Sequence, residues 1–159
     1  MTTKNTDLVA NFEATPQVAN SAAELAGVLR TAHGSVELAA GDSTDDDIVM
    51  LAPIPSNAAV PTLFVGSDTF GGSCTFNVGI YKTDGTVKDE DVFATSVADA
   101  AAMADVRYEA ADLNTGSQKL WELAGDSTDP GGYFYIAITF NATGGTAGTL
   151  NCNISYVVD

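Results

Sequence analysis

Positive charge is scarce in this chain. Its 159 residues hold 6 Lys and Arg against 21 Asp and Glu, which gives a formal net charge of −15. A polyanion such as DNA, RNA or an anionic membrane is repelled by so acidic a chain, and the few basic residues are scattered rather than gathered into a patch. We therefore expect neither a nucleic acid nor a membrane among its partners.

Histidine is scarcer still, because His33 is the only one. It falls within a predicted strand, and no neighbouring serine occupies the strand-to-helix turn of a nucleophile elbow. The acidic turn at 42–47 lacks the alternate oxygen ligands and the final Glu of a calcium loop, so we interpret it as a solvated turn. We expect no catalytic residue, no metal ion and no cofactor.

Two cysteines, Cys74 and Cys152, are too few for a disulfide scaffold, and they lack the spacing of zinc ligands. Each lies in phase with the apolar residues of its predicted strand, which favours buried free thiols. A disulfide between neighbouring strands or between subunits is the alternative interpretation.

Long apolar runs are also absent from the sequence. No run approaches the roughly 20 residues that span a bilayer, and residues 1–11 lack the basic and apolar regions of a signal peptide. These features predict a soluble protein that is made in a cytoplasm.

Alternation of apolar and polar residues is the main positive signal. Hydrophobic residues make up 45% of the chain and charged residues only 17%, so Thr, Ser, Asn and Gly must carry much of the surface, as in a β-sandwich. The pattern predicts an all-β, antiparallel β-sandwich of the jelly-roll kind, formed as one domain by residues 27–159. We expect strands at 28–39 (with a bulge at Gly34), 48–54, 60–66, 74–80 and 106–111.

The last stretch, residues 133–158, predicts a β-hairpin around a Gly-rich turn near Gly145. In this hairpin Phe140 would face Leu150 and Ile138 would face Cys152, so that one face of the pair is apolar. The other face would carry four side chains that are candidates for a subunit contact, namely Tyr133, Tyr135, Asn151 and Asn153.

Helical signals are few and short. A capping box at 21–24 predicts at most one helical turn, and a further short helix is expected at 98–103. Residues 119–123 are expected to form either a helical turn or an edge segment. Residues 86–93 are expected to be irregular.

The first 26 residues have few bulky apolar side chains and cannot form a core of their own. We expect an extended N-terminal arm that packs on a neighbouring subunit through Leu8, Val9 and Phe12.

Several segments of this chain together resemble the head decoration, or cement, proteins of tailed bacteriophages. They are GVLRTAHGS (27–35), IVMLAPIP (48–55), VGIYKTDGTV (78–87) and LWELAG (120–125) with DPGG (129–132), and the resemblance covers nearly the whole chain. It implies a small, non-enzymatic virion protein, made in the host cytoplasm, that binds the major capsid protein on the outer capsid surface, commonly as a homotrimer.

Two other roles remain open. The first is a neck or head-fibre component of the same particle. The second is a carbohydrate-binding module for host attachment, in which exposed aromatic side chains such as Trp121 or Tyr133 would stack on sugars.

Overall fold

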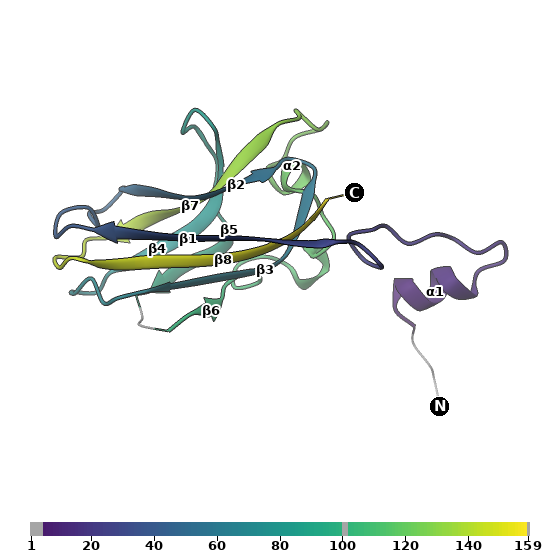
Figure 1. The fold of residues 1–159 in the computed structure, drawn as a ribbon, viewed down its shortest axis with the longest axis horizontal. Helices are drawn as coiled ribbons and strands as arrows, with labels where there is room; N and C mark the ends of the chain where they lie inside the picture. Colours follow the sequence, from purple (N-terminus) through teal and green to yellow (C-terminus); the bar gives the residue numbers. More distant parts are fainter. Residues whose placement is uncertain (1–4, 100–101, 159) are drawn as a thin grey trace.

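The computed structural model describes residues 5–99 and 102–158 and has two four-stranded antiparallel sheets packed as a sandwich (Figure 1). Sheet A has the order β1-β8-β3-β6, and sheet B has the order β2-β7-β4-β5. This is the strand order of a jelly roll built from two Greek keys, so the predicted fold class is confirmed. The strands are β1 (Leu29–Leu38), β2 (Ile48–Pro55), β3 (Ala58–Ser67), β4 (Thr75–Lys82), β5 (Val87–Ala98), β6 (Ala104–Asp105), β7 (Tyr133–Ala142) and β8 (Gly148–Val158).

The helical elements are short and lie outside the sheets. They are α1 (Asp7–Glu13), the 3-10 turn η1 (Leu113–Thr115) and α2 (Leu120–Leu123). The predicted turn at 119–123 is confirmed by α2, and the one at 21–24 by a hydrogen-bonded turn in which Leu25 N donates to Ser21 O at 3.0 Å. Helix α1 was not predicted, so the segment expected to be extended is partly helical.

The predicted hairpin between β7 and β8 is wrong. Strand β7 pairs with β2 and β4 in sheet B, whereas β8 pairs with β1 and β3 in sheet A. Residues 143–147 therefore cross from one sheet to the other, and the apolar faces of the two strands lie opposite each other across the core. A period of two shows that one face of a strand is apolar, but it does not show whether the partner strand lies beside that face or across from it.

The loops at one end of the sandwich are tied together through the core residue Phe70. Gly145 N donates to Phe70 O at 2.7 Å, and Phe70 N donates to Asp99 Oδ2 at 2.6 Å. The Phe70 ring meets Phe140 edge to face, with the ring centroids 5.6 Å apart. These contacts fix the β3–β4 and β7–β8 connections against each other, at the end of the sandwich opposite the N-terminal segment (Figure 1).

Gly34 does not mark a bulge. The register between β1 and β8 is unbroken from Leu29 to Leu38. A Cβ at position 34 would lie 3.1 Å from Leu51 O and 3.3 Å from Cys152 Sγ, so the glycine instead allows β1 to approach β2 and the core closely.

The prediction that residues 86–93 are irregular is wrong, because β5 runs along β4 from Val87 to Ala98. Its pairing is interrupted: between the pairs Val78↔Ala94 and Ile80↔Asp89, β5 has three more residues than β4. The extra residues lie over Gly79, where a Cβ would stand 2.1 Å from Asp89 O. The acidic composition of this segment is not typical of a strand, and β5 was therefore not predicted. Its extra residues cover part of the outer face of sheet B.

The predicted helix at 98–103 is wrong where it can be compared. Ala98 belongs to β5, and Ala102 and Met103 are not helical, while residues 100–101 lie outside the described residues. The predicted strand at 106–111 is also wrong, because the only strand here is the two-residue β6.

A buried arginine explains why residues 106–111 turn rather than extend. The side chain of Arg107 is fully buried, its Nε donates to Val60 O at 2.6 Å, and one terminal nitrogen donates to Thr115 O at 2.9 Å. The guanidinium lies between the rings of Phe93 and Tyr108, 5.0 and 4.7 Å from their centroids. Burial lowers the pKa of Arg107, although Tyr108 in its ionised form and the carboxylate of Asp105 act in the opposite direction. Because the long side chain of Arg107 points into the protein, the residues around it do not follow the alternating inward and outward pattern of a strand.

Candidate functional site

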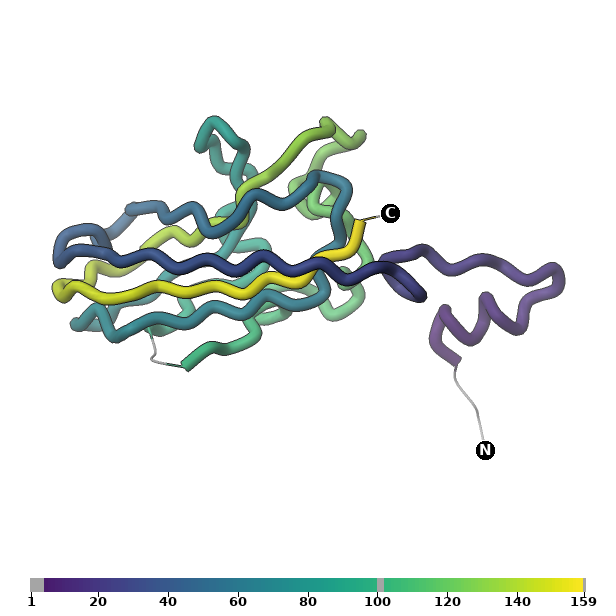
Figure 2. Tube along the Cα trace, viewed as in Figure 1, coloured from purple at the N-terminus to yellow at the C-terminus, as the bar shows by residue number. Residues whose placement is uncertain are grey.

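The N-terminal segment, residues 5–26, lies beyond the end of the sandwich (Figure 1). When the chain trace is followed from β1 back towards the N-terminus, the segment runs away from the sandwich and then turns back through α1 (Figure 2). None of the residues of α1 is buried, and Leu8, Val9 and Phe12 are 36%, 42% and 70% exposed. The three apolar residues predicted for a subunit contact thus lie on one helix and are at least partly exposed, although Leu8 borders a pocket that Tyr108 and Leu113 also line.

The segment is held in shape by its own hydrogen bonds. Asn11 Nδ2 donates to Asn20 Oδ1 at 2.7 Å, and Val18 N donates to Asn11 O at 3.1 Å. Its exit from the sandwich is tightly packed, since a Cβ at Gly27 would lie 1.9 Å from Ala22 O and 2.6 Å from a methyl carbon of Val157. These contacts set the direction in which the segment leaves β1.

The four residues predicted for the outer face of a hairpin do not form one surface. Tyr133 and Tyr135 belong to β7 in sheet B, whereas Asn151 and Asn153 belong to β8 in sheet A. Because the two sheets face each other through the core, their outer faces look in opposite directions. The wrong hairpin is the cause of this error.

Asn151 and Asn153 lie at the centre of an uncharged face on the outside of sheet A. Asn153 stands between His33 on β1 and Phe64 on β3, and Ser155 stands between Thr31 and Thr62. The strands β1, β8 and β3 hold a single carboxylate, Glu37, among the 21 acidic residues of the chain. This face is therefore nearly free of the charge that surrounds it.

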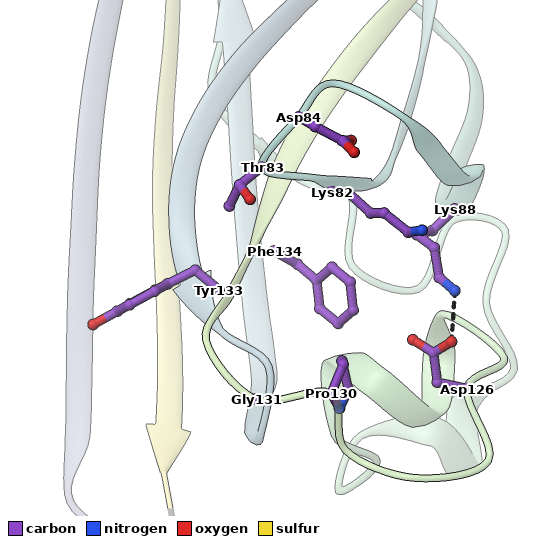
Figure 3. A pocket seen from close by; sticks show the side chains of 9 residues that line it. All are labelled: Lys82, Thr83, Asp84, Lys88, Asp126, Pro130, Gly131, Tyr133 and Phe134. Atoms are coloured by element: carbon purple, nitrogen blue, oxygen red, sulfur yellow. Dashed lines mark hydrogen bonds and ion pairs between the residues drawn. The ribbon is translucent and has the colours of Figure 1, made fainter.

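Tyr133 lies at the edge of a pocket of about 270 Å³ at the start of β7 (Figure 3). The tyrosine is 58% exposed, and Phe134 lies beside it. An ion pair closes one side, because Lys88 Nζ lies 2.6 Å from Asp126 Oδ1. Trp121, the other aromatic considered for sugar stacking, is half-buried and packs against the core instead.

Both cysteines are buried and free, Cys74 beside sheet B and Cys152 in β8 of sheet A. Burial raises the pKa of both thiols, and for Cys74 the charge of Asp99 adds to the effect. A thiol that is both buried and protonated reacts slowly. Neither side chain is placed to form a bond with another subunit.

The acidic residues with lowered pKa values serve the turns. Hydrogen bonds from Thr44 lower the pKa of Asp47, and bonds from Ser56 and Gly131 lower that of Asp129. In the part of the chain that the structure describes, no three His, Cys, Asp or Glu side chains gather as a metal site. No helix within residues 5–99 and 102–158 is long and apolar enough to span a membrane.

No family model and no curated protein sequence matches the chain. Solved structures do. The chain is similar to one in the cyanophage Pam1 capsid asymmetric unit, with a TM-score of 0.50 and 14% identity over 84% of this chain and 86% of that one.

Two further structures are less similar. A chain of the infectious bursal disease virus Gx strain gives a TM-score of 0.49 and 13% identity, over 82% of this chain and 32% of that chain. A chain of the acidic stable capsid of Helicobacter pylori bacteriophage KHP30 gives 0.35 and 15%, over 82% of this chain and 94% of that one. At 14% identity the first of these comparisons establishes the fold alone, which this chain shares with a chain of the cyanophage Pam1 capsid asymmetric unit.

Proposed function

We propose that this protein is a non-enzymatic structural component of a tailed-phage virion, which binds the major capsid protein on the outer surface of the head and strengthens the shell. The observation that carries the proposal is the apolar N-terminal arm, residues 5–26, which stands off a sandwich of the kind found in a phage capsid. An arm of this kind is suited to reaching a neighbouring subunit. By the resemblance, the copies associate as homotrimers.

The exposed apolar area of the arm is large for so short a segment. Five large apolar side chains of the arm are exposed, namely Leu8, Val9, Phe12, Val18 and Leu25. Burying a fully exposed side chain of this kind contributes about 1.5–3 kcal/mol, so covering the parts of Leu8, Val9 and Phe12 that are still exposed would supply about 2–4 kcal/mol of binding free energy. Repetition over a capsid surface then raises the effective affinity further.

Replacing Phe12 with aspartate is expected to weaken binding to capsids roughly 30-fold or more, because the most exposed apolar group of α1 becomes charged. The measurement is co-sedimentation of the purified full-length variant with capsids that lack the protein. Val87→Asp is the matched control, since Val87 on β5 is also exposed and the same charge is added there. Equal loss of binding by both variants would contradict a role for the arm.

The number of copies per particle tests the position in the virion. A protein that decorates the head repeats with the icosahedral shell, so on the order of hundreds of copies are expected, whereas a neck ring closes after about a dozen. Quantitative mass spectrometry of purified particles gives this number directly. A count near a dozen would contradict decoration and would indicate a neck or fibre role.

Attachment to a host glycan is the alternative of a different class. It would rest on Tyr133, which is among the residues that line the pocket of Figure 3, although its ring points away from the other side chains drawn there. With Trp121 packed against the core, a single exposed aromatic remains there, and an ion pair occupies one side of the pocket. Sugar sites commonly rely on stacking against exposed rings, so decoration is the better supported proposal.

A further inference from the structure

The two sheets of the sandwich have four outer edges, and three of them are blocked. Unpaired strand edges invite pairing with another chain, and native proteins blunt them with prolines, bulges, charges or very short strands. Strand β2 has a register shift after Met50 together with Pro53 and Pro55. Strand β5 has three register shifts and the charged run 88–91, and β6 has only two residues.

Strand β1 has no proline, no bulge and no run of charged residues. It is ten residues long and keeps an unbroken register with β8 on one side. On its other side it has no strand partner among residues 5–99 and 102–158. A long, regular edge of this kind is a template for strand addition.

The side chains along this edge also need a cover. Val36 on β1 and Ile48 and Met50 on the adjacent β2 are 37%, 45% and 38% exposed. Between the two strands, beside Gly34, lies a cavity of about 90 Å³ that reaches the buried Leu150 and Cys152. An unpaired backbone edge and an apolar strip thus lie side by side.

The distribution of charge indicates which partner can pair with the edge of β1. The chain has a net charge of −15, so two copies repel each other over most of their surface. Strand β1 is an exception, because Arg30 and Glu37 balance and His33 is counted as neutral. When two β1 strands run antiparallel, the Arg30 end of each lies beside the Glu37 end of the other, whereas parallel strands would place like charges together.

We propose that β1 is a self-association edge, at which the β1 strands of two copies pair antiparallel and continue sheet A across a two-fold axis. Such an isologous contact satisfies both unpaired edges at once and brings Ile48 and Met50 of the two copies towards each other. It is independent of the arm. On a decorated head it would join neighbouring trimers, whose own contacts use the arm.

The test uses full-length protein carrying Phe12→Asp, so that association through the arm is weakened. We expect this variant to form dimers in sedimentation equilibrium, with slowed hydrogen exchange in β1 that is lost on dilution. Adding Thr31→Glu and Ser35→Glu is expected to raise the dimer dissociation constant roughly tenfold or more, because like charges then oppose each other across the paired strands. Both positions are exposed in one copy, so the fold should tolerate the changes.

The matched control adds Asn151→Glu and Ser155→Glu to the same background. These residues pair directly with Ser35 and Thr31 but lie on β8, one strand away from the edge. We expect the control to change the dissociation constant by roughly threefold or less. A monomeric Phe12→Asp protein at every concentration, or equal effects of the two pairs of substitutions, would overturn the proposal. A Phe12→Asp dimer that persists while the protein without any substitution fails to bind capsids would refute decoration and leave the β1 contact standing.

Discussion

Replacing Arg107 with methionine is expected to lower the free energy of unfolding by about 3 kcal/mol, since a buried carbonyl left without a donor costs about 1–3 kcal/mol and the contacts of the guanidinium with the rings of Phe93 and Tyr108 are lost as well. The carbonyl that loses its donor is that of Val60, whereas Thr115 O keeps the hydrogen bond from Gln118 N. Among the described residues no carboxylate forms a salt bridge with Arg107, so no opposite charge is left unpaired. Chemical denaturation monitored by tryptophan fluorescence measures the effect.

Arg30→Met is the control for this substitution, because Arg30 is exposed on β1. It is expected to change the free energy of unfolding by no more than about 0.5 kcal/mol. Hydrogen exchange should locate the damage in Arg107→Met to residues 106–117, which the guanidinium attaches to β3. Unchanged or increased stability would mean that desolvation of the buried charge costs more than its contacts contribute, as occurs for some buried ion pairs.

Replacing Gly79 with alanine is the second change expected to be severe, at about 3 kcal/mol. The new Cβ would lie 2.1 Å from Asp89 O and 2.3 Å from Glu90 C, both of which are backbone atoms that cannot rotate away. The extra residues of β5 would have to lift off β4. This would expose the hydrogen bond between the hydroxyls of Tyr81 and Thr139, both of which are buried.

Gly145→Ala is the matched control, because nothing lies within 4 Å of the position of its Cβ. The control is expected to change stability by no more than about 0.5 kcal/mol. Limited proteolysis should show new cleavage near residues 88–91 in Gly79→Ala alone. If both glycine variants unfold at the same denaturant concentration, the segment above Gly79 is not packed as described.

The sequence predicted the strands better than it predicted their partners. Alternation located β1, β2, β3, β4, β7 and β8, because each has one face in the core and the period of two records this directly. It did not locate β5, whose extra residues break the period where they cover Gly79. It also misplaced the strand near Arg107, because a buried arginine counts as polar in any such pattern.

The error over β7 and β8 has a physical cause that is general. A Gly-rich connection of five residues can close a hairpin or carry the chain between two sheets, and only tertiary contacts decide between them. Here those contacts involve residues far away in the sequence: Gly144 N donates to Ser43 O, and Gly145 N to Phe70 O. Residue chemistry near the turn contained no sign of either partner.

The exposure of the candidate contact residues could be predicted in part. Exposure of Leu8, Val9 and Phe12 could be expected from an apolar cluster in a segment too poor in apolar residues to form a core. The position of Tyr133 and Asn153 on opposite faces could not, because it depends on the arrangement of the sheets. The unblocked edge of β1 could not be predicted either, because the sequence alone does not show which strands lie at the edges of the sheets.

The central strand of sheet A is the last one to be made. Strand β8 lies between β1 and β3 and is the direct partner of both. During synthesis, more than a hundred residues are therefore added after β1 before its partner strand β8 is made. Pairings between such distant segments form slowly, and until β8 arrives both edges of β1 are open to other chains. The order of synthesis thus leaves β1 of the nascent chain open to pairing with other chains, and β1 is also the strand whose edge stays unblocked in the folded protein.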